Sequence, residues 1–149
     1  MTWVLVAIAS AAAAVAVVVG LDRAEMRVAA RHPEVQGARL RDTVLLGGVE
    51  GPGLPRLHGK GVLAVQGDNL VLVMASPPQH VTTIPVHQIT TVDLTTALRV
   101  RGHWVRNRRH WLRVRWQTGE GVATIGLVVP EPALWARVLK HAAQRDTSG

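Results

Sequence analysis

The sequence predicts a mainly β domain of about seven strands, preceded by a transmembrane helix and closed by a C-terminal helix. Three observations lead to this prediction. Residues 2–21 are apolar and uncharged, and short Val- and Leu-rich runs after residue 40 are separated by turn residues. The third is a helical apolar stripe within residues 132–142. The length of 149 residues allows one domain with an appendage.

The composition excludes several kinds of site. The chain has no cysteine, so a disulfide scaffold, a thiolate zinc site and a cysteine nucleophile are excluded. It has five Trp but no Phe or Tyr, and we therefore expect a core of Val, Leu, Ile and Ala. The formal net charge is +7, and the excess of positive charge belongs to one segment, residues 99–115.

The first 21 residues predict a retained membrane anchor. Residues 2–21 carry no charge, and a spanning helix needs roughly 20 apolar residues to cross ~30 Å of hydrocarbon. Trp3 stands where an interfacial aromatic would stand. A cleaved signal peptide and a buried soluble helix are the alternatives. A signal peptide requires basic residues near its start, however, and no Lys or Arg precedes Trp3.

Basic residues beside this segment predict its orientation. Five arginines follow it within about 20 residues, whereas only the α-amino group precedes it, which places the N-terminus outside and the C-terminal domain in the cytoplasm. The expected division is an anchor at 1–21, a helical extension and linker at 22–39, the β domain at 40–145 and a tail at 146–149.

Seven runs of residues predict the strands of the β domain. They are 42–50, 59–66, 70–76, 80–86, 88–96, 110–117 and 122–129. Pro85, late in its run, indicates an edge or a bend. After the last run, residues 130–132 suit the first turn of a helix. The apolar stripe of this helix consists of Leu134, Trp135, Val138, Leu139 and Ala142.

Five segments together resemble a known family. They are residues 61–65, 68–72, 83–92, 112–116 and 134–139. Their pattern resembles bacterial, membrane-tethered pleckstrin-homology-like (PH-like) domains over residues 40–145. The resemblance implies a barrel with a Trp of the closing helix over its mouth, and a binding module rather than an enzyme. The loop at 51–61 departs from phosphoinositide-binding members, because its only basic residues are Arg56, His58 and Lys60.

The stretch LRVRGHWVRNRRHWLRVRW, residues 98–116, offers the clearest candidate for a binding surface. It holds seven arginines, and no acid lies between Asp93 and Glu120. Clustered guanidinium groups favour an external anion or an acidic partner. The candidate contact residues are Arg99, Arg101, Arg106, Arg108, Arg109, Trp111, Arg113 and Arg115.

A hairpin with its turn about Asn107 would place several of these residues on one face. The register then pairs Arg101 with Arg113 and Arg99 with Arg115, and Trp111 extends the same face. Like charges directly opposite each other destabilise a sheet. Alternatively, Gly102 breaks the arm and leaves residues 99–110 as a long loop.

Four interpretations of this segment remain open. It docks on anionic lipid, with Trp104 and Trp111 at the headgroup level. It binds an acidic protein, since Arg and Trp are enriched at interface hot spots. It binds nucleic acid, which a membrane tether makes a weaker expectation. Otherwise it is only a solvated surface.

Other chemistry has little support in the sequence. His103 with His110, and His80 with His87, lack a neighbouring carboxylate or thiolate, so we expect no metal site. Asp93 is expected to pair with a nearby Arg, and no cofactor motif is present. The sequence thus predicts a non-catalytic single-pass membrane protein that binds or scaffolds at the inner membrane face.

Overall fold

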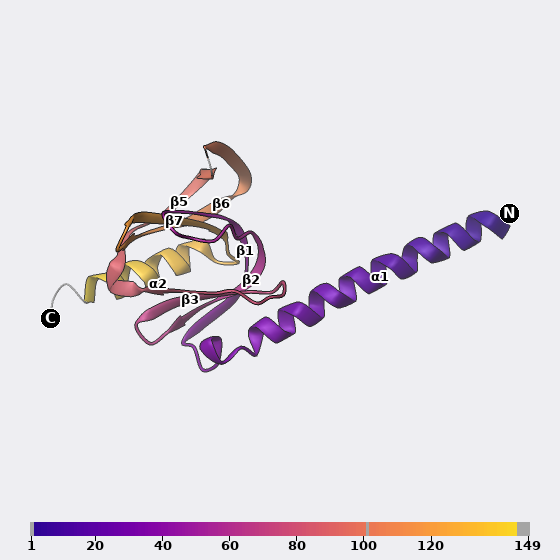
Figure 1. Ribbon diagram of the computed structural model, residues 1–149, viewed down its shortest axis with the longest axis horizontal. Helices are drawn as coiled ribbons and strands as arrows, with labels where there is room; N and C mark the ends of the chain where they lie inside the picture. The colour runs from indigo at the N-terminus through magenta and orange to yellow at the C-terminus, as the bar shows by residue number, and fades with distance from the viewer. Residues whose placement is uncertain (1, 101, 146–149) are drawn as a thin grey trace.

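The β domain is one seven-stranded antiparallel sheet in the order β4-β3-β2-β1-β7-β6-β5 (Figure 1). The computed structural model describes the backbone of residues 2–100 and 102–145, and within these ranges the side chains of residue 15 and of 17 onward. The strands are β1 (Leu40–Glu50), β2 (Gly59–Gln66), β3 (Asn69–Met74), β4 (Val81–Pro85), β5 (Ile89–Val100), β6 (His103–Thr118) and β7 (Gly121–Val128).

Each of the seven predicted strands is confirmed, and the fifth and sixth are several residues longer than predicted. β5 continues to Val100 and β6 already begins at His103, so the two form one long hairpin. Pro85 ends β4 at one end of the sheet, as its position in the sequence indicates, and the short 3-10 helix η2 (Val86–Gln88) follows it.

The inner face of the sheet and the C-terminal helix α2 (Pro132–Arg145) enclose the main core. The predicted apolar stripe is confirmed at its centre, where Trp135 and Leu139 are fully buried. The Trp135 Nε1–H donates a hydrogen bond to Asp42 Oδ2 at 2.8 Å. This bond satisfies the polar atom of a buried indole, so Trp135 can fill the core without an unpaired donor.

The outer face of β2 and β3 carries a second, smaller core. The end of α1 (Thr2–Ala30) and the 3-10 helix η1 (Pro33–Val35) lie on it, and Ala29 and Val35 are buried there. Lys60 of β2 forms an ion pair with Asp22 of α1. The extension predicted at 22–39 is therefore packed against the sheet.

The first part of α1 projects away from the β domain (Figure 1). Among the described residues, no helix has both the length and the hydropathy that a membrane span requires. The anchor prediction rests mostly on the side chains of residues 1–14 and 16, which lie outside the described ones, as does the predicted tail at 146–149.

Candidate functional site: the β5–β6 hairpin

The hairpin of β5 and β6 turns at Gly102, so the predicted turn about Asn107 is wrong. Val100 lies opposite His103 across this turn. Gly102 has a φ of +79°, a left-handed conformation that glycine adopts without steric penalty and that short hairpin turns need. Asn107 lies within β6 instead. The alternative of a long loop at 99–110 is wrong as well.

The observed register replaces the predicted arginine pairs. Arg99 lies opposite Trp104, Arg113 opposite Asp93, and Arg115 opposite Thr91. Arg101 lies outside the described residues. The change of turn therefore removes the predicted like-charge contacts of Arg99 with Arg115, and it gives Arg113 an acid as its neighbour.

Asp93 and Arg113 form an ion pair with two hydrogen bonds. The Arg113 Nε–H donates to Asp93 Oδ1 at 2.8 Å, and an Nη2–H donates to Oδ2. These hydrogen bonds, aided by the charges of Arg113, Arg115 and Lys140, hold the pKa of the Asp93 carboxyl below its usual value, although partial burial opposes them. The expected pairing of Asp93 is confirmed, and Arg113 is partly neutralised within the sheet.

An irregularity divides the hairpin into two halves. Thr95 lies opposite Trp111 but Ala97 lies opposite Arg106, so residues 107–110 of β6 face the single residue 96. An insertion of this kind bends a strand and increases its twist. We refer to residues 89–95 with 111–118 as the proximal half, and to residues 96–100 with 102–110 as the distal half.

Leu98 and Val100 of the distal half and Trp111 of the proximal half lie over the outer face of β1 and β7, where glycines make room for them. The close approaches are those of Leu98 to Gly126, Val100 to Gly48 and Trp111 to Gly47, where an added Cβ would lie 2.0, 2.7 and 2.5 Å from the facing side chain, respectively. Real Cβ atoms do not approach so closely, so larger residues at these positions would displace the hairpin.

Trp111 is buried by this packing, and the prediction that it belongs to an exposed binding face is wrong. Its position in the alternation is the predicted one, because Leu112, its neighbour in β6, faces the core. Only 4% of its surface is exposed, however, since the hairpin bends back over it. Its Nε1 has no hydrogen-bond partner within the described residues. Trp111 thus holds the bend of the hairpin in place.

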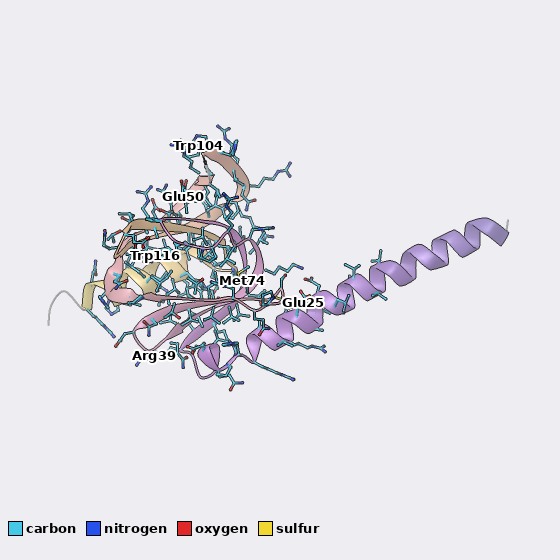
Figure 2. All side chains as sticks on the ribbon, in the orientation of Figure 1. Glu25, Arg39, Glu50, Met74, Trp104 and Trp116 are labelled. Atoms are coloured by element: carbon cyan, nitrogen blue, oxygen red, sulfur yellow. The ribbon has the colours of Figure 1, made fainter. Side chains whose placement is uncertain are left out.

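The distal half presents the exposed part of the candidate site (Figure 2). Trp104 is 66% exposed and projects from the end of the hairpin, and the neighbouring Val105 is exposed as well. Its exposed arginines are Arg99, Arg106, Arg108 and Arg109. In the part of the chain that the structure describes, ion pairs join only Lys60 with Asp22 and Arg113 with Asp93, so these four arginines have no acidic partner.

Two residues of the exposed surface differ from the predicted set. Trp104 was expected only as one of two Trp at a lipid surface. It is the exposed one of the two, whereas Trp111 is buried. Val105 was missed, because the predicted contact set was chosen from Arg and Trp and left out exposed aliphatic side chains. The available signal was Gly102, which suits a tight turn, but Asn107 suits one as well. Arg115 is exposed but lies in the proximal half, across from Thr91.

Comparisons with known proteins found neither a family model nor a curated protein that matches this chain. Among the described residues, no three His, Cys, Asp or Glu side chains are grouped so that they could hold a metal ion. The chemistry available to the distal half is therefore that of guanidinium groups beside an exposed indole. This combination suits contact with a surface that is anionic outside and apolar beneath.

Proposed function

We propose that this chain is a non-catalytic, membrane-anchored binding protein, and that the distal half of its hairpin docks on anionic lipid. The observation that supports this most is the exposed indole of Trp104, next to Val105, among arginines without an acidic partner in the described chain. Trp favours the interfacial region of a bilayer, and Arg is attracted to anionic headgroups.

The expected strength of docking follows from the exposed charge. Each Arg near an anionic surface contributes ~1 kcal/mol, so the four arginines together contribute about 4 kcal/mol. Alone, this corresponds to a Kd of about 1 mM. A membrane anchor in the same chain makes docking intramolecular. An effective concentration of lipid surface in the millimolar range then matches this Kd and is sufficient for docking. We therefore infer a reversible contact that salt weakens.

Residues 1–21 are proposed as the anchor, with the N-terminus outside the cell membrane and the β domain in the cytoplasm. The uncharged apolar sequence and the arginines that follow it support this orientation. The first part of α1 and the end of the hairpin both project from the β domain, in different directions (Figure 1). Contact of both with one membrane surface therefore requires the β domain to tilt toward the membrane on its anchor.

The anchor and its orientation can be tested together, because the chain has no native cysteine. We expect the protein to stay in the membrane after alkaline carbonate extraction. In an Arg137→Cys variant, an impermeant thiol reagent should label the protein only after the membrane is opened, since Arg137 is an exposed residue of α2. Release by carbonate, or labelling of intact spheroplasts, would contradict the proposal.

The β domain is proposed to be PH-like. The antiparallel order with β1 at its centre, and the closing helix α2 with Trp135 buried in the core, support this assignment. Domains of this kind bind lipids, peptides or proteins. The loop between β1 and β2 has few basic residues, so we place the lipid contact in the distal half of the β5–β6 hairpin instead.

Docking can be measured by hydrogen–deuterium exchange of the full chain in nanodiscs. We expect the backbone amides of residues 97–110 to exchange more slowly in discs with about one-third anionic lipid than in purely zwitterionic discs, because docking excludes water. The effect should disappear at about 0.5 M salt, where charges are screened over a few ångströms. Residues 59–74 of β2 and β3 serve as the internal control, and their exchange should not change.

A matched pair of charge variants identifies the surface. Arg106→Gln with Arg108→Gln should abolish most of the protection, whereas Arg56→Gln with Arg137→Gln removes the same charge elsewhere and should retain it. Equal exchange in anionic and zwitterionic discs would overturn lipid docking. Capture of an acidic membrane protein by the wild type, but not by the Arg106 and Arg108 variant, would then assign the surface to a protein partner.

A further inference from the structure

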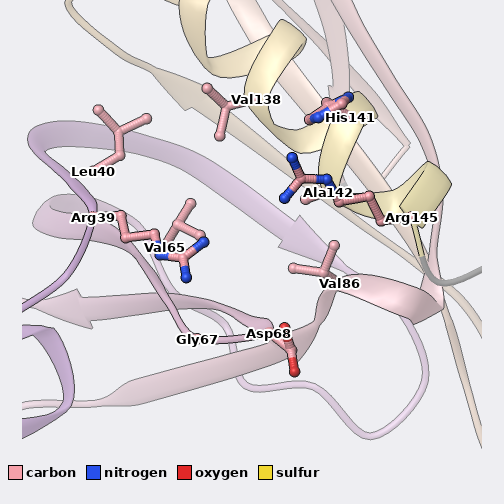
Figure 3. A pocket seen from close by; sticks show the side chains of 10 residues that line it. All are labelled: Arg39, Leu40, Val65, Gly67, Asp68, Val86, Val138, His141, Ala142 and Arg145. Carbon is pink, nitrogen blue, oxygen red and sulfur yellow. The ribbon is translucent and has the colours of Figure 1, made fainter.

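A pocket of about 250 Å³ lies between the C-terminal half of α2, the turn from β2 to β3 and the start of β1 (Figure 3). Backbone hydrogen bonds fix its walls. The Val86 N–H donates to the Asp68 carbonyl at 2.9 Å, and the Arg39 N–H donates to the Val65 carbonyl at 3.2 Å. The pocket is therefore formed by the fold itself rather than by loose side chains.

One part of the pocket lining is apolar. Val65 and Val86 are buried in its wall, and Leu40 and Val138 are partly buried beside them. These side chains come from β1, β2, η2 and α2, and they leave an apolar surface that the fold does not cover. A short aliphatic group could remove this surface from water, at about 25 cal/mol for each Å².

The rest of the lining is basic. Arg39 and Arg145 reach toward the pocket from opposite walls, and His141 lies on α2 near Arg145 (Figure 3). Asp68 is the one acid among the lining residues, and in the described chain it forms no ion pair with either arginine. Two guanidinium groups that share a space without an ion-pair partner repel each other, and an anion between them would remove this repulsion.

We propose that this pocket binds a small amphiphilic anion, namely a carboxylate or phosphate group on a short aliphatic body. The guanidinium groups of Arg39 and Arg145 hold the anionic group through paired N–H donors, and the valines cover the aliphatic part. The volume lies just below the ~300 Å³ at which pockets for larger ligands begin, which favours a body of a few carbon atoms. The site shares no residue with the proposed lipid contact.

Arg145 also has a structural role that the test must separate from binding. It lies in the last turn of α2, where a cation stabilises the helix through the helix dipole. Loss of stability in an Arg145 variant would therefore say nothing about a ligand. The test needs a signal that depends on added ligand and maps to the pocket.

The probes are butyl phosphate, butanoate, inorganic phosphate and 1-butanol, each titrated into the full chain in zwitterionic nanodiscs and followed by amide NMR shifts. We expect saturable shifts at Gly67, Val86 and Ala142 with at least one of the two butyl anions. Inorganic phosphate and butanol should each bind at least about tenfold more weakly, because each lacks half of the interaction. The butyl anion that binds more tightly identifies the anionic group that the pocket prefers.

Variants complete the test. Arg39→Gln and Arg145→Gln should each weaken binding of the butyl anion about tenfold, as expected for loss of one charged hydrogen-bonding partner. Arg137→Gln, an exposed residue of the same helix, should bind as the wild type does. The proposal is overturned if neither butyl anion saturates, if butanol or inorganic phosphate binds as tightly, or if both pocket variants keep wild-type affinity. Zwitterionic discs keep the outcome independent of anionic-lipid docking.

Discussion

The two halves of the β5–β6 hairpin contain the same kinds of residue and use them differently. In the proximal half, Trp111 is 4% exposed and Arg113 is paired with Asp93. In the distal half, Trp104 is 66% exposed, and arginines such as Arg106 have no acidic partner in the described chain. Burial and pairing, which the register determines, separate residues that hold the sheet together from residues available to a ligand.

This difference shows that a run of basic residues in a sequence is not itself a binding surface. The irregularity at Thr95 and Ala97 bends the hairpin, and the glycines of β1 and β7 leave room for the hairpin to pack against them. The bend buries one Trp and presents the other. Variants of each half should therefore affect different properties, namely the free energy of unfolding for the proximal half and lipid contact for the distal half.

The largest expected difference is between the two Trp residues. Trp111→Ala should lower the free energy of unfolding by about 3–5 kcal/mol, because it leaves a cavity beneath the bent hairpin. Trp104→Ala should change it by no more than about 0.5 kcal/mol, since its side chain is mostly in solvent. Denaturant unfolding of the full chain in mild detergent measures both. Equal effects would contradict the assignment of one Trp to packing and the other to the surface.

The glycine contact beneath Trp111 should give the next largest effect. Gly47→Ala should cost about 1–3 kcal/mol, because a Cβ there would lie 2.5 Å from a carbon of the Trp111 ring. Gly119→Ala is the matched control, since nothing lies within 4 Å of its added Cβ, and it should change the free energy of unfolding by less than about 0.5 kcal/mol. A neutral Gly47→Ala would show that the hairpin does not pack closely on β1.

The ion pair of the proximal half should have a smaller effect that depends on pH. Asp93→Asn should cost roughly 0.5–1 kcal/mol at pH 7, since the pair is partly exposed and solvent screens it. The folded-state pKa of Asp93 is lowered, so its stabilisation is present above the unfolded-state value of about 4 and is lost as the pH falls through the folded-state value. Unfolding curves at several pH values should therefore converge for wild type and variant in acid. A difference that persists in acid would show another cause.

The smallest effect on stability is expected in the distal half. Arg106→Gln with Arg108→Gln should change the free energy of unfolding by less than about 0.5 kcal/mol, because both residues are exposed and have no acidic partner in the described chain. The same variant should lose most of its exchange protection on anionic nanodiscs. Marked destabilisation, measured in detergent without anionic lipid, would indicate that these arginines stabilise the hairpin itself.

The sequence predicted the sheet well, because local signals define each strand. Turn residues such as Gly67 and Asp68, and the apolar stripe around Trp135, are read within a few neighbouring positions. The hairpin register was not predictable in this way, since Gly102 and Asn107 both suit a turn. The choice depends on packing against β1 and β7, which no local pattern around Gly102 or Asn107 records.

The burial of Trp111 and the pocket at Arg39 could not be predicted from the sequence for the same reason. Trp111 is covered because Gly47 in β1 and Gly126 in β7 let the hairpin approach, and no local pattern around Trp111 records those glycines. Arg39 and Arg145 stand near opposite ends of the β domain sequence, and only the folded chain brings them to one pocket. Tertiary contacts, rather than local preferences, determine both features.

Depth-dependent quenching of Trp104 by brominated lipid tests the central proposal most directly. The full chain would be reconstituted beside a Trp104→Phe variant, and the difference between them isolates Trp104 from the other four Trp residues. We predict that Trp104 is quenched in membranes with about one-third anionic lipid and much less in zwitterionic ones, because the arginines bring it to the interface. Identical quenching of wild type and variant in anionic membranes would contradict docking by the distal half.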